Sequence, residues 1–426
     1  MPYRSLPVTP DLDQLKHQAK DLLRAIRAGD SAATAELREF HPEPIDPSNA
    51  KLADAQLVLA RSYHASSWTR LVQAVQLVNA IWNDDIKTVR DLVTANPNLI
   101  HEEALIRKDS NWGPPMTYAA NVGRDEIIRM LDTMGAKDHR TALGRAVLQG
   151  KIATARMIHA ILGNPKPPAH ALGGPAYTLN VEGTAVIFEF GGDDVRMYDD
   201  DGKLLAPVET VLQTDGRNPD AKHAILEMYV ERGLRLPDTP VFALHRGRID
   251  LLEEHLRRDP GLLNRTWSHR DVYPDELLCG PPGNATVGTP LGGTTLLHMC
   301  IDYDEMEIAR WLIANGADVN ARSAVGANGF GGYTPIFNTV VSQPNFWMNY
   351  RNRGPFVAPF TELLLEHGAD PNVHASIWKS LHTGHGDPTR HDYRDVTPLS
   401  WGRKFHAPIF VSEPAMKLIE AAGGVE

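Results

Sequence analysis

Residues 293–322, GTTLLHMCIDYDEMEIARWLIANGADVNAR, contain two short helical patterns joined by a turn and closed by a glycine. Thr295 stands before the first pattern, where its hydroxyl can cap a helix, and Leu296 and Leu297 follow as core residues. Gly316 stands where a helix ends in the left-handed conformation. The stretch therefore predicts a pair of helices that pack against each other.

A TPLH-like turn, two helices and a GADxN loop, in this order, resemble the consensus of the ankyrin repeat. The interval from Thr295 to Gly316 recurs between Pro114 and Gly135. A stack of about eight such units buries a continuous core. More divergent copies occupy residues 80–93, 141–163, 207–233, 239–256, 334–368 and 397–423.

The rest of the chain falls into a leader and an insertion. Leu15, Leu22 and Ile26 recur with helical spacing in the leader. Between residues 173 and 205 apolar residues alternate instead, which predicts a small antiparallel sheet. We therefore predict a mostly α-helical ankyrin-repeat solenoid in four parts: an N-terminal helical cap (1–73), N-terminal repeats (74–170), a β insertion (171–206) and C-terminal repeats with long fingers (207–426).

The composition excludes several classes of function. The chain of 426 residues has a formal charge of −10, and binding to nucleic acid phosphates requires a basic face. We see no apolar stretch long enough to cross a membrane and no signal-peptide pattern. Cys279 and Cys300 are the two cysteines, so no disulfide framework is expected. These features predict a cytoplasmic protein that binds neither nucleic acid nor membrane.

Four segments together resemble a group of bacterial cytoplasmic ankyrin-repeat proteins. They are a leader PDLDQLKHQAKDLLRAIRAGD (10–30), LADAQLVLARSYHASSWTRL (52–71), a presumed strand insert AYTLNVEGTAVIFEF (176–190) and RDVTPLSWGRKFH (394–406). The likeness spans nearly the whole chain. It implies the fold and the compartment, and it carries no catalytic residue over to this chain.

Three consecutive repeat junctions in the C-terminal half carry insertions. In an ankyrin array these junctions form fingers that stand side by side along a concave groove, so longer fingers enlarge one surface. We name them the first finger (265–292), the second finger (323–332) and the third finger (373–396). Their clustering is the strongest functional signal in the sequence.

Aromatic and charged residues of this region could surround a ligand. The alternative is that Trp401 packs between helices and that the arginines pair with Asp392 and Asp395. His298, in the TPLH position, is expected to form hydrogen bonds between fingers. The predicted ligand-binding residues are Trp267, His269, Asp271, Tyr273, Tyr333, Tyr393, Arg394, Trp401 and Arg403.

The third finger is also rich in histidine and aspartate. His382, His385, Asp387 and His391 offer ligands that suit a divalent metal, although their spacing matches no known motif. Without a metal, His385 or His391 with Asp392 could act as a general base. The competing interpretation is a solvated polar loop.

Two functions follow from these patterns. The leading hypothesis is a binding protein that holds a partner protein or a small-molecule ligand in the concave C-terminal groove. The alternative is an enzyme built from the same fingers, an acid/base or metal-assisted lyase, isomerase or hydrolase. An apolar stretch inserted within one repeat, Phe346–Tyr350, could also mediate a homodimer.

Overall fold

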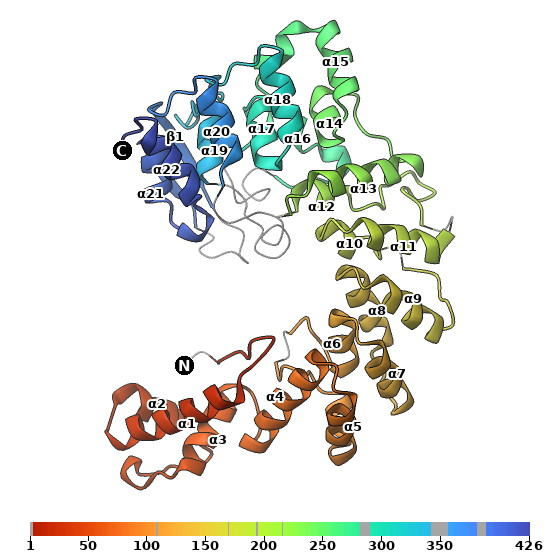
Figure 1. Ribbon diagram of the computed structural model, residues 1–426, viewed down its shortest axis with the longest axis vertical. Helices are drawn as coiled ribbons and strands as arrows, with labels where there is room; N and C mark the ends of the chain where they lie inside the picture. Colours follow the sequence, from red (N-terminus) through yellow and green to blue (C-terminus); the bar gives the residue numbers. More distant parts are fainter. Residues whose placement is uncertain are drawn as a thin grey trace. The chain divides into compact units, whose positions relative to one another are not determined.

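The computed structural model describes residues 3–107, 110–168, 170–192, 195–214, 216–281, 290–341, 357–380 and 389–426. The chain divides into two compact units, Met1–Lys166 and Pro167–Glu426. Short α-helices that follow one another in pairs make up most of each unit (Figure 1). The predicted mostly α-helical class is confirmed.

The N-terminal unit begins with α1 (Leu12–Arg27), α2 (Ser31–Phe40), the 3-10 turn η1 (Pro47–Asn49) and α3 (Leu52–Ser62). Asp11 caps α1, because its carboxylate accepts hydrogen bonds from two backbone N–H groups of the first turn at 2.8 and 3.2 Å. Leu15 and Leu22 lie on the buried face of α1. This face packs with buried residues of α2 and α3 in one hydrophobic cluster.

Three helix pairs follow in this unit: α4 (Trp68–Trp82) with α5 (Ile86–Ala95), α6 (Pro115–Val122) with α7 (Asp125–Thr133), and α8 (His139–Leu148) with α9 (Ile152–Ile161). The 3-10 turn η2 (Pro97–Ile100) links the first pair to the second. The first helices pack in series, α4 on α6 and α6 on α8, and α5 packs on α7. The helix α4 begins inside the stretch predicted as a cap, so the first repeat is longer than its sequence pattern indicated.

The C-terminal unit contains six helix pairs within its described residues. Its first helices also pack in series, for example α14 on α17, α17 on α19 and α19 on α21. The pairs are α10 (Gly173–Tyr177) with α11 (Val181–Gly191), α12 (Val208–Gln213) with α13 (Pro219–Glu231), α14 (Pro240–His245) with α15 (Ile249–Arg258), α17 (Leu296–Tyr303) with α18 (Met306–Ala314), α19 (Pro335–Val340) with α20 (Pro359–Glu366), and α21 (Pro398–Lys404) with α22 (Glu413–Ala421). Short connecting turns are η4 (Pro260–Asn264), α16 (His269–Val272), η5 (Asp275–Leu277) and η6 (Pro408–Phe410).

The predicted β insertion at residues 171–206 is wrong, because the helices α10 and α11 lie where its first two strands were expected. Thr184, Ile187 and Phe188 are buried on α11 at helical spacing, and Asn180 caps the helix by accepting from the Gly183 N–H at 2.8 Å. Both helices pack on the next pair, α10 on α12 and α11 on α13. The segment therefore continues the stack instead of interrupting it.

The small antiparallel sheet that the fold class included lies in the third finger. It consists of β1 (Ala375–Lys379) and β2 (His391–Val396). Trp378 is paired with Asp392, and Ile377 is paired with Tyr393. The predicted polar finger is therefore a β-hairpin with one face turned toward α21.

Backbone hydrogen bonds connect the three fingers. Gly293 N–H donates to the Trp267 carbonyl at 2.6 Å, and Ala324 N–H donates to the Gly293 carbonyl at 2.7 Å. Gly331 N–H then donates to the Ser376 carbonyl at 2.7 Å. The fingers therefore stand side by side, as the repeat pattern predicts.

No helix in the described part of the chain is long and apolar enough to cross a membrane. The helix α1 has 16 residues and α4 has 15, whereas a transmembrane helix needs about 20 apolar residues. Both helices bury one face within the N-terminal unit and expose the other.

Candidate functional site

Side chains of β2 alternate between two surroundings. Arg390, immediately before the strand, lies with Asp392 and Arg394 on the exposed side, and Tyr393 is buried on the other. Successive side chains of a strand point to opposite faces, so His391 lies on the same side as Tyr393. The strand therefore separates exposed charged residues from a set that packs inward.

The exposed set contacts two aromatic rings. The guanidinium carbon of Arg390 lies 5.1 Å from the ring centroid of Phe330 and 4.8 Å from that of Trp378. The guanidinium carbon of Arg394 lies 4.3 Å from the centroid of Phe330. Arg390 also donates from Nε to Asp392 Oδ1 at 2.7 Å. We call Phe330, Trp378, Arg390, Asp392 and Arg394 the arginine–aromatic face.

The arginine–aromatic face joins the second finger to the third. Phe330 belongs to the second finger and is only 6% exposed. The side chains of Arg390 and Arg394 remain 48% and 60% exposed. Stacking on a ring holds a guanidinium plane in place while its N–H edge can still bind a carboxylate. The face thus presents two oriented guanidinium groups to solvent, with the Asp392 carboxylate 2.7 Å from Arg390 Nε and 3.9 Å from Arg394 Nη2.

The inward set forms an aromatic cluster around α21. The backbone N–H of His406 donates to the Tyr393 hydroxyl at 3.0 Å, and that hydroxyl lies 2.6 Å from His406 Nδ1. The rings of Tyr393 and Trp401 meet edge to face at 4.7 Å, and those of His391 and His406 stack at 3.8 Å. Burial raises the pKa of Tyr393. Trp401 is fully buried, so it packs between structural elements.

The predicted residues of the first finger have local structural partners. Trp267 is 9% exposed. Asp271 and Ser268 form a reciprocal capping box at the start of α16. His269 Nε2 lies 2.9 Å from the Gly280 carbonyl oxygen, and burial lowers the pKa of its imidazole. Tyr273 is buried, and its hydroxyl forms a hydrogen bond with the hydroxyl of Tyr303. Burial raises the pKa of Tyr273.

Tyr333 and His298 connect the second finger to α17. His298 Nδ1 accepts from the Thr295 backbone N–H at 3.3 Å, and its Nε2 lies 3.1 Å from the Tyr333 carbonyl oxygen. A carbonyl oxygen can only accept, so Nε2 carries the proton. The Tyr333 hydroxyl donates to the Pro290 carbonyl at 2.5 Å. Burial lowers the pKa of His298 to about 4, so the neutral form makes these bonds near pH 7. His298 therefore makes the hydrogen bond between fingers that its sequence position predicts.

Arg403 lies apart from the arginine–aromatic face. Its Nε is 2.6 Å from Glu426 Oε1, and Nη2 is 3.7 Å from Glu420 Oε1. Arg403 also lines a cavity of about 400 Å³ with residues of α21 and α22. The structure therefore does not place Arg403 beside Arg394.

Much of the predicted catalytic and metal cluster lies outside the described residues. This holds for His382, His385 and Asp387. Within the described ranges, no group of three or more histidine, cysteine, aspartate or glutamate side chains has the arrangement of a metal site. His391 and Asp392 lie on opposite faces of β2, and Asp392 pairs with Arg390. The predicted dimer segment Phe346–Tyr350 is also outside the described residues.

A buried ionic cluster in the C-terminal unit was not predicted. Arg217 Nη2 lies 2.9 Å from Asp302 Oδ2, and its Nε donates to the Asp302 backbone carbonyl at 2.6 Å. Lys222 Nζ and His223 Nε2 lie 2.7 and 2.9 Å from Glu305 Oε1. Arg217, Lys222, Asp302 and Glu305 are each 5% exposed or less. The cluster joins the α12–α13 repeat to the α17–α18 repeat.

Aromatic rings surround this ionic cluster. The Lys222 ammonium lies 4.4 Å from the ring centroid of Tyr303, and the Arg217 guanidinium carbon lies 5.2 Å from it. The ring of His245, fully buried on α14, meets Tyr303 edge to face at 4.9 Å. Burial, with the nearby Lys222 charge, holds the pKa of His245 well below its usual value. Because Tyr273 contacts Tyr303, the cluster also positions the first finger.

Comparison with known families identifies one of the repeats. Residues 292–324 match the family model of the ankyrin repeat. The chain contains an ankyrin repeat. The matched segment covers α17, α18 and the beginning of the second finger. Neighbouring helix pairs repeat the same order of helix, turn and helix, which confirms the predicted ankyrin-repeat fold.

Solved structures that are similar to this chain include the ankyrin repeat domain of Bcl-3, described as a unique member of the IkappaB protein family. The two chains are 13% identical, the comparison covers 81% of this chain and 97% of that one, and the TM-score is 0.21. No curated protein sequence matches the chain.

Proposed function

We propose that the protein is a binding protein whose C-terminal unit holds a partner protein on the arginine–aromatic face. The observation that carries this proposal is the stacking of Arg390 and Arg394 on Phe330, with Trp378 beside them. Arginine and tryptophan are the residues most enriched at energetically important positions of protein interfaces. These side chains are already ordered before a partner binds, which reduces the conformational entropy that is lost on binding.

The charges of this face favour a partner segment that carries carboxylates. The chain as a whole has a formal charge of −10. The two exposed arginines therefore carry charge of the opposite sign to that of the whole chain. Guanidinium groups bind carboxylates through paired hydrogen bonds. Asp392 already occupies one such position on Arg390, at 2.7 Å. A partner carboxylate would bind the donors that Asp392 does not use.

The surroundings of the predicted aromatic residues favour a protein partner over a small ligand. Tyr273, Tyr393 and Trp401 are each buried and packed against neighbouring rings. Their surfaces therefore serve the packing of the fingers. Cys279 and Cys300 are buried free thiols, which suits the cytoplasmic location that we propose for the protein.

The test compares partner capture by three forms of the full-length protein. Immobilised wild type, the double variant Arg390→Glu/Arg394→Glu and the control Arg258→Glu are exposed to the same cell extract. Arg258 lies on α15, and its side chain is 59% exposed, close to the value for Arg394. We expect partners of the wild type to bind the double variant at least about tenfold more weakly, a loss of about 1.4 kcal/mol. The control should bind them unchanged.

A purified partner then allows the affinity to be measured by titration calorimetry. Equal affinity for the wild type and the double variant would remove the arginine–aromatic face from the proposal. Thermal unfolding of each variant shows that the charge reversals leave the fold intact. A loss of affinity that the Arg258→Glu control shares would mean that net charge, and not this face, determines binding.

A further inference from the structure

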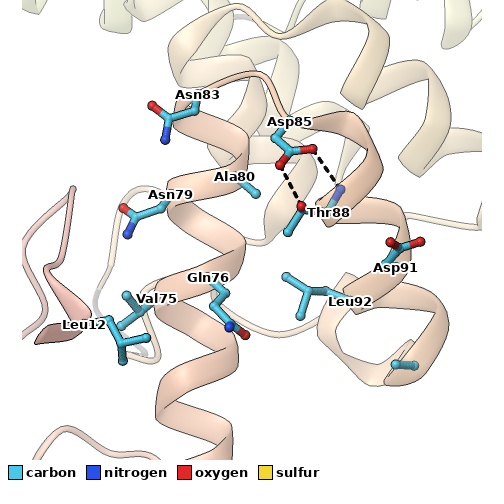
Figure 2. A pocket seen from close by; sticks show the side chains of 11 residues that line it. Leu12, Val75, Gln76, Asn79, Ala80, Asn83, Asp85, Thr88, Asp91 and Leu92 are labelled. Atoms are coloured by element: carbon cyan, nitrogen blue, oxygen red, sulfur yellow. Dashed lines mark hydrogen bonds between the residues drawn. The ribbon is translucent and has the colours of Figure 1, made fainter. Parts of the chain in front are cut away.

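A groove of about 480 Å³ lies between α4 and α5 in the N-terminal unit. Its accessible apolar lining comes from Leu12 at the start of α1 and from Leu92 and Ala95 on α5, with Val75 buried beneath, and the rest of the lining is mostly polar. Gln76 and Leu92 extend toward each other from the two helices, and Leu12 lies beside Val75 (Figure 2). The groove is separate from the arginine–aromatic face, which belongs to the other unit.

Unequal covering of the two helices leaves this groove open. The cap helices α1 and α3 pack on α4. The main contacts of α5 are with α4, η2 and α7. In the following repeats, second helices pack on each other, as α5 does on α7 and α11 does on α13. Within the described residues, no second helix of a preceding repeat packs extensively on the side of α5 that borders the groove.

The spacing of the lining residues suits a helix. They are residues 75, 76, 79 and 80 on α4 with Asn83 at its C-terminal cap, and 88, 91, 92 and 95 on α5 with Asp85 at its N-terminal cap, so that most have a neighbour three or four positions away. These intervals of three and four residues place each set on one face of its helix. Two parallel rows of this kind form the groove in which an amphipathic helix lays its apolar face.

The rim of the groove is acidic. Asp85 accepts hydrogen bonds from the Thr88 N–H and hydroxyl at 3.0 and 2.6 Å, and these bonds hold the pKa of its carboxyl below the usual value. Asp91 lies 2.7 Å from Lys87 Nζ, yet its side chain is 62% exposed. Both carboxylates are thus exposed at the rim of the groove.

We propose that this groove binds an amphipathic, basic helix of a partner protein. Apolar side chains of that helix pack on Leu12, Leu92 and Ala95, and its lysines or arginines face Asp85 and Asp91. The bound helix takes the position that a second helix of a preceding repeat would have beside α5. Charge complementarity decides the occupant, since an acidic helix would meet repulsion at the rim.

The test uses a synthetic peptide of leucine and lysine in helical spacing, about 15 residues long, with a fluorescein label. Its binding to the full-length protein is measured by fluorescence anisotropy. The variants are Asp91→Lys, which reverses a rim charge, and Leu92→Gln, which makes the floor polar. The control is Glu126→Lys on α7, where the side chain is 78% exposed and pairs with an arginine one turn away.

We expect each groove variant to weaken peptide binding at least tenfold and the control to leave it unchanged. A matching peptide with glutamate in place of lysine should bind at least tenfold more weakly than the lysine peptide. Groove variants that bind like the wild type, or equal binding of the two peptides, would overturn the proposal. Asp91 is a surface residue, so Asp91→Lys decides the question even if Leu92→Gln unfolds.

Sedimentation of the unliganded protein tests the other occupant, a second copy of this chain. We expect the same sedimentation coefficient for the wild type and Asp91→Lys over a range of concentrations. If the wild type self-associated and Asp91→Lys did not, the occupant of the groove would be a second copy of this chain and not a partner helix.

Discussion

Replacing Glu305 with glutamine is expected to destabilise the C-terminal unit by about 3 kcal/mol. The side chain of Glu305 is 3% exposed, and its Oε1 lies 2.7 Å from the ammonium of Lys222, which is itself 4% exposed. Removing one partner of a buried ion pair typically costs about 3–5 kcal/mol, because the other charge stays buried without compensation. Glutamine keeps the volume and can still accept a hydrogen bond, so we expect the lower end of this range.

Hydrogen exchange measured by mass spectrometry localises the effect to this unit. Amides of α13 and α17 should exchange about 150-fold faster, which corresponds to 3 kcal/mol when exchange follows the opening equilibrium. Glu254→Gln is the matched control, because Glu254 forms an exposed pair with Arg258 at 3.1 Å on α15. That substitution should cost at most about 0.5 kcal/mol.

A double variant separates the charge effect from a packing effect. Lys222→Met with Glu305→Leu removes both buried charges, and His223, which is 21% exposed, can bond to water in place of Glu305. We expect its stability to lie within about 1 kcal/mol of the wild type. If Glu305→Gln destabilised the unit no more than Glu254→Gln does, the buried ion pair would have no role in its stability.

Three further predictions concern the same unit. Burial opposes ionisation of Glu305, but Lys222 and His223 hold its pKa below the usual value. The ionised carboxylate therefore contributes fully to the free energy of unfolding above the unfolded pKa of about 4.3, and this contribution is lost as pH falls through the folded pKa. Urea midpoints should accordingly fall with acid more steeply for wild type than for Glu305→Gln, and parallel curves would contradict this assignment. Gly331 has φ +127°, and an added Cβ would lie 2.1 Å from the Ala324 carbonyl oxygen; Gly331→Ala should cost about 1–3 kcal/mol and speed proteolysis of the second finger, and unchanged cleavage would show that the backbone absorbs the strain. His298→Ala removes one of two hydrogen bonds that the Tyr333 carbonyl accepts, the other coming from the Ser323 N–H at 2.8 Å, and takes the acceptor from the buried Thr295 N–H; it should lower the free energy of unfolding by about 1–3 kcal/mol, whereas a loss below about 0.5 kcal/mol in urea titrations would argue against these bonds.

Local signals made the repeat predictable. Thr295 at a helix start and Gly316 at a helix end act within a few residues, and Gly316 has the left-handed φ of +97° that its position requires. The helices α17 and α18 accordingly lie where the sequence pattern placed them. Cap, periodicity and stop signals suffice because each depends on the chain's own neighbouring residues.

The same local reading failed at α11. Val186, Phe188 and Phe190 alternate as in a strand, while Thr184 and Ile187 complete a helical face in the same stretch. β-branched and aromatic residues are compatible with either structure when they are buried. The packing of α11 on α13 decides the outcome, and no local pattern reports that contact.

The candidate site was predictable only in outline. The sequence located the three long fingers and singled out Arg394 as a binding residue. It could not show that Tyr393 turns inward while Arg394 stacks on Phe330, because the direction of each side chain depends on which face of β2 packs on α21. A change of one residue in strand register would exchange the two faces.

By itself, the sequence determined that most of the chain forms paired helices and where the helices of residues 293–322 begin and end. The tertiary structure decided which charges are buried together and which residues face solvent. Arg217 and Asp302 are 85 positions apart in the chain and meet only because the repeats stack. Charges become this strongly coupled only when neighbouring helices remove water from around them, and that exclusion is a property of the packed unit, not of any segment of the sequence.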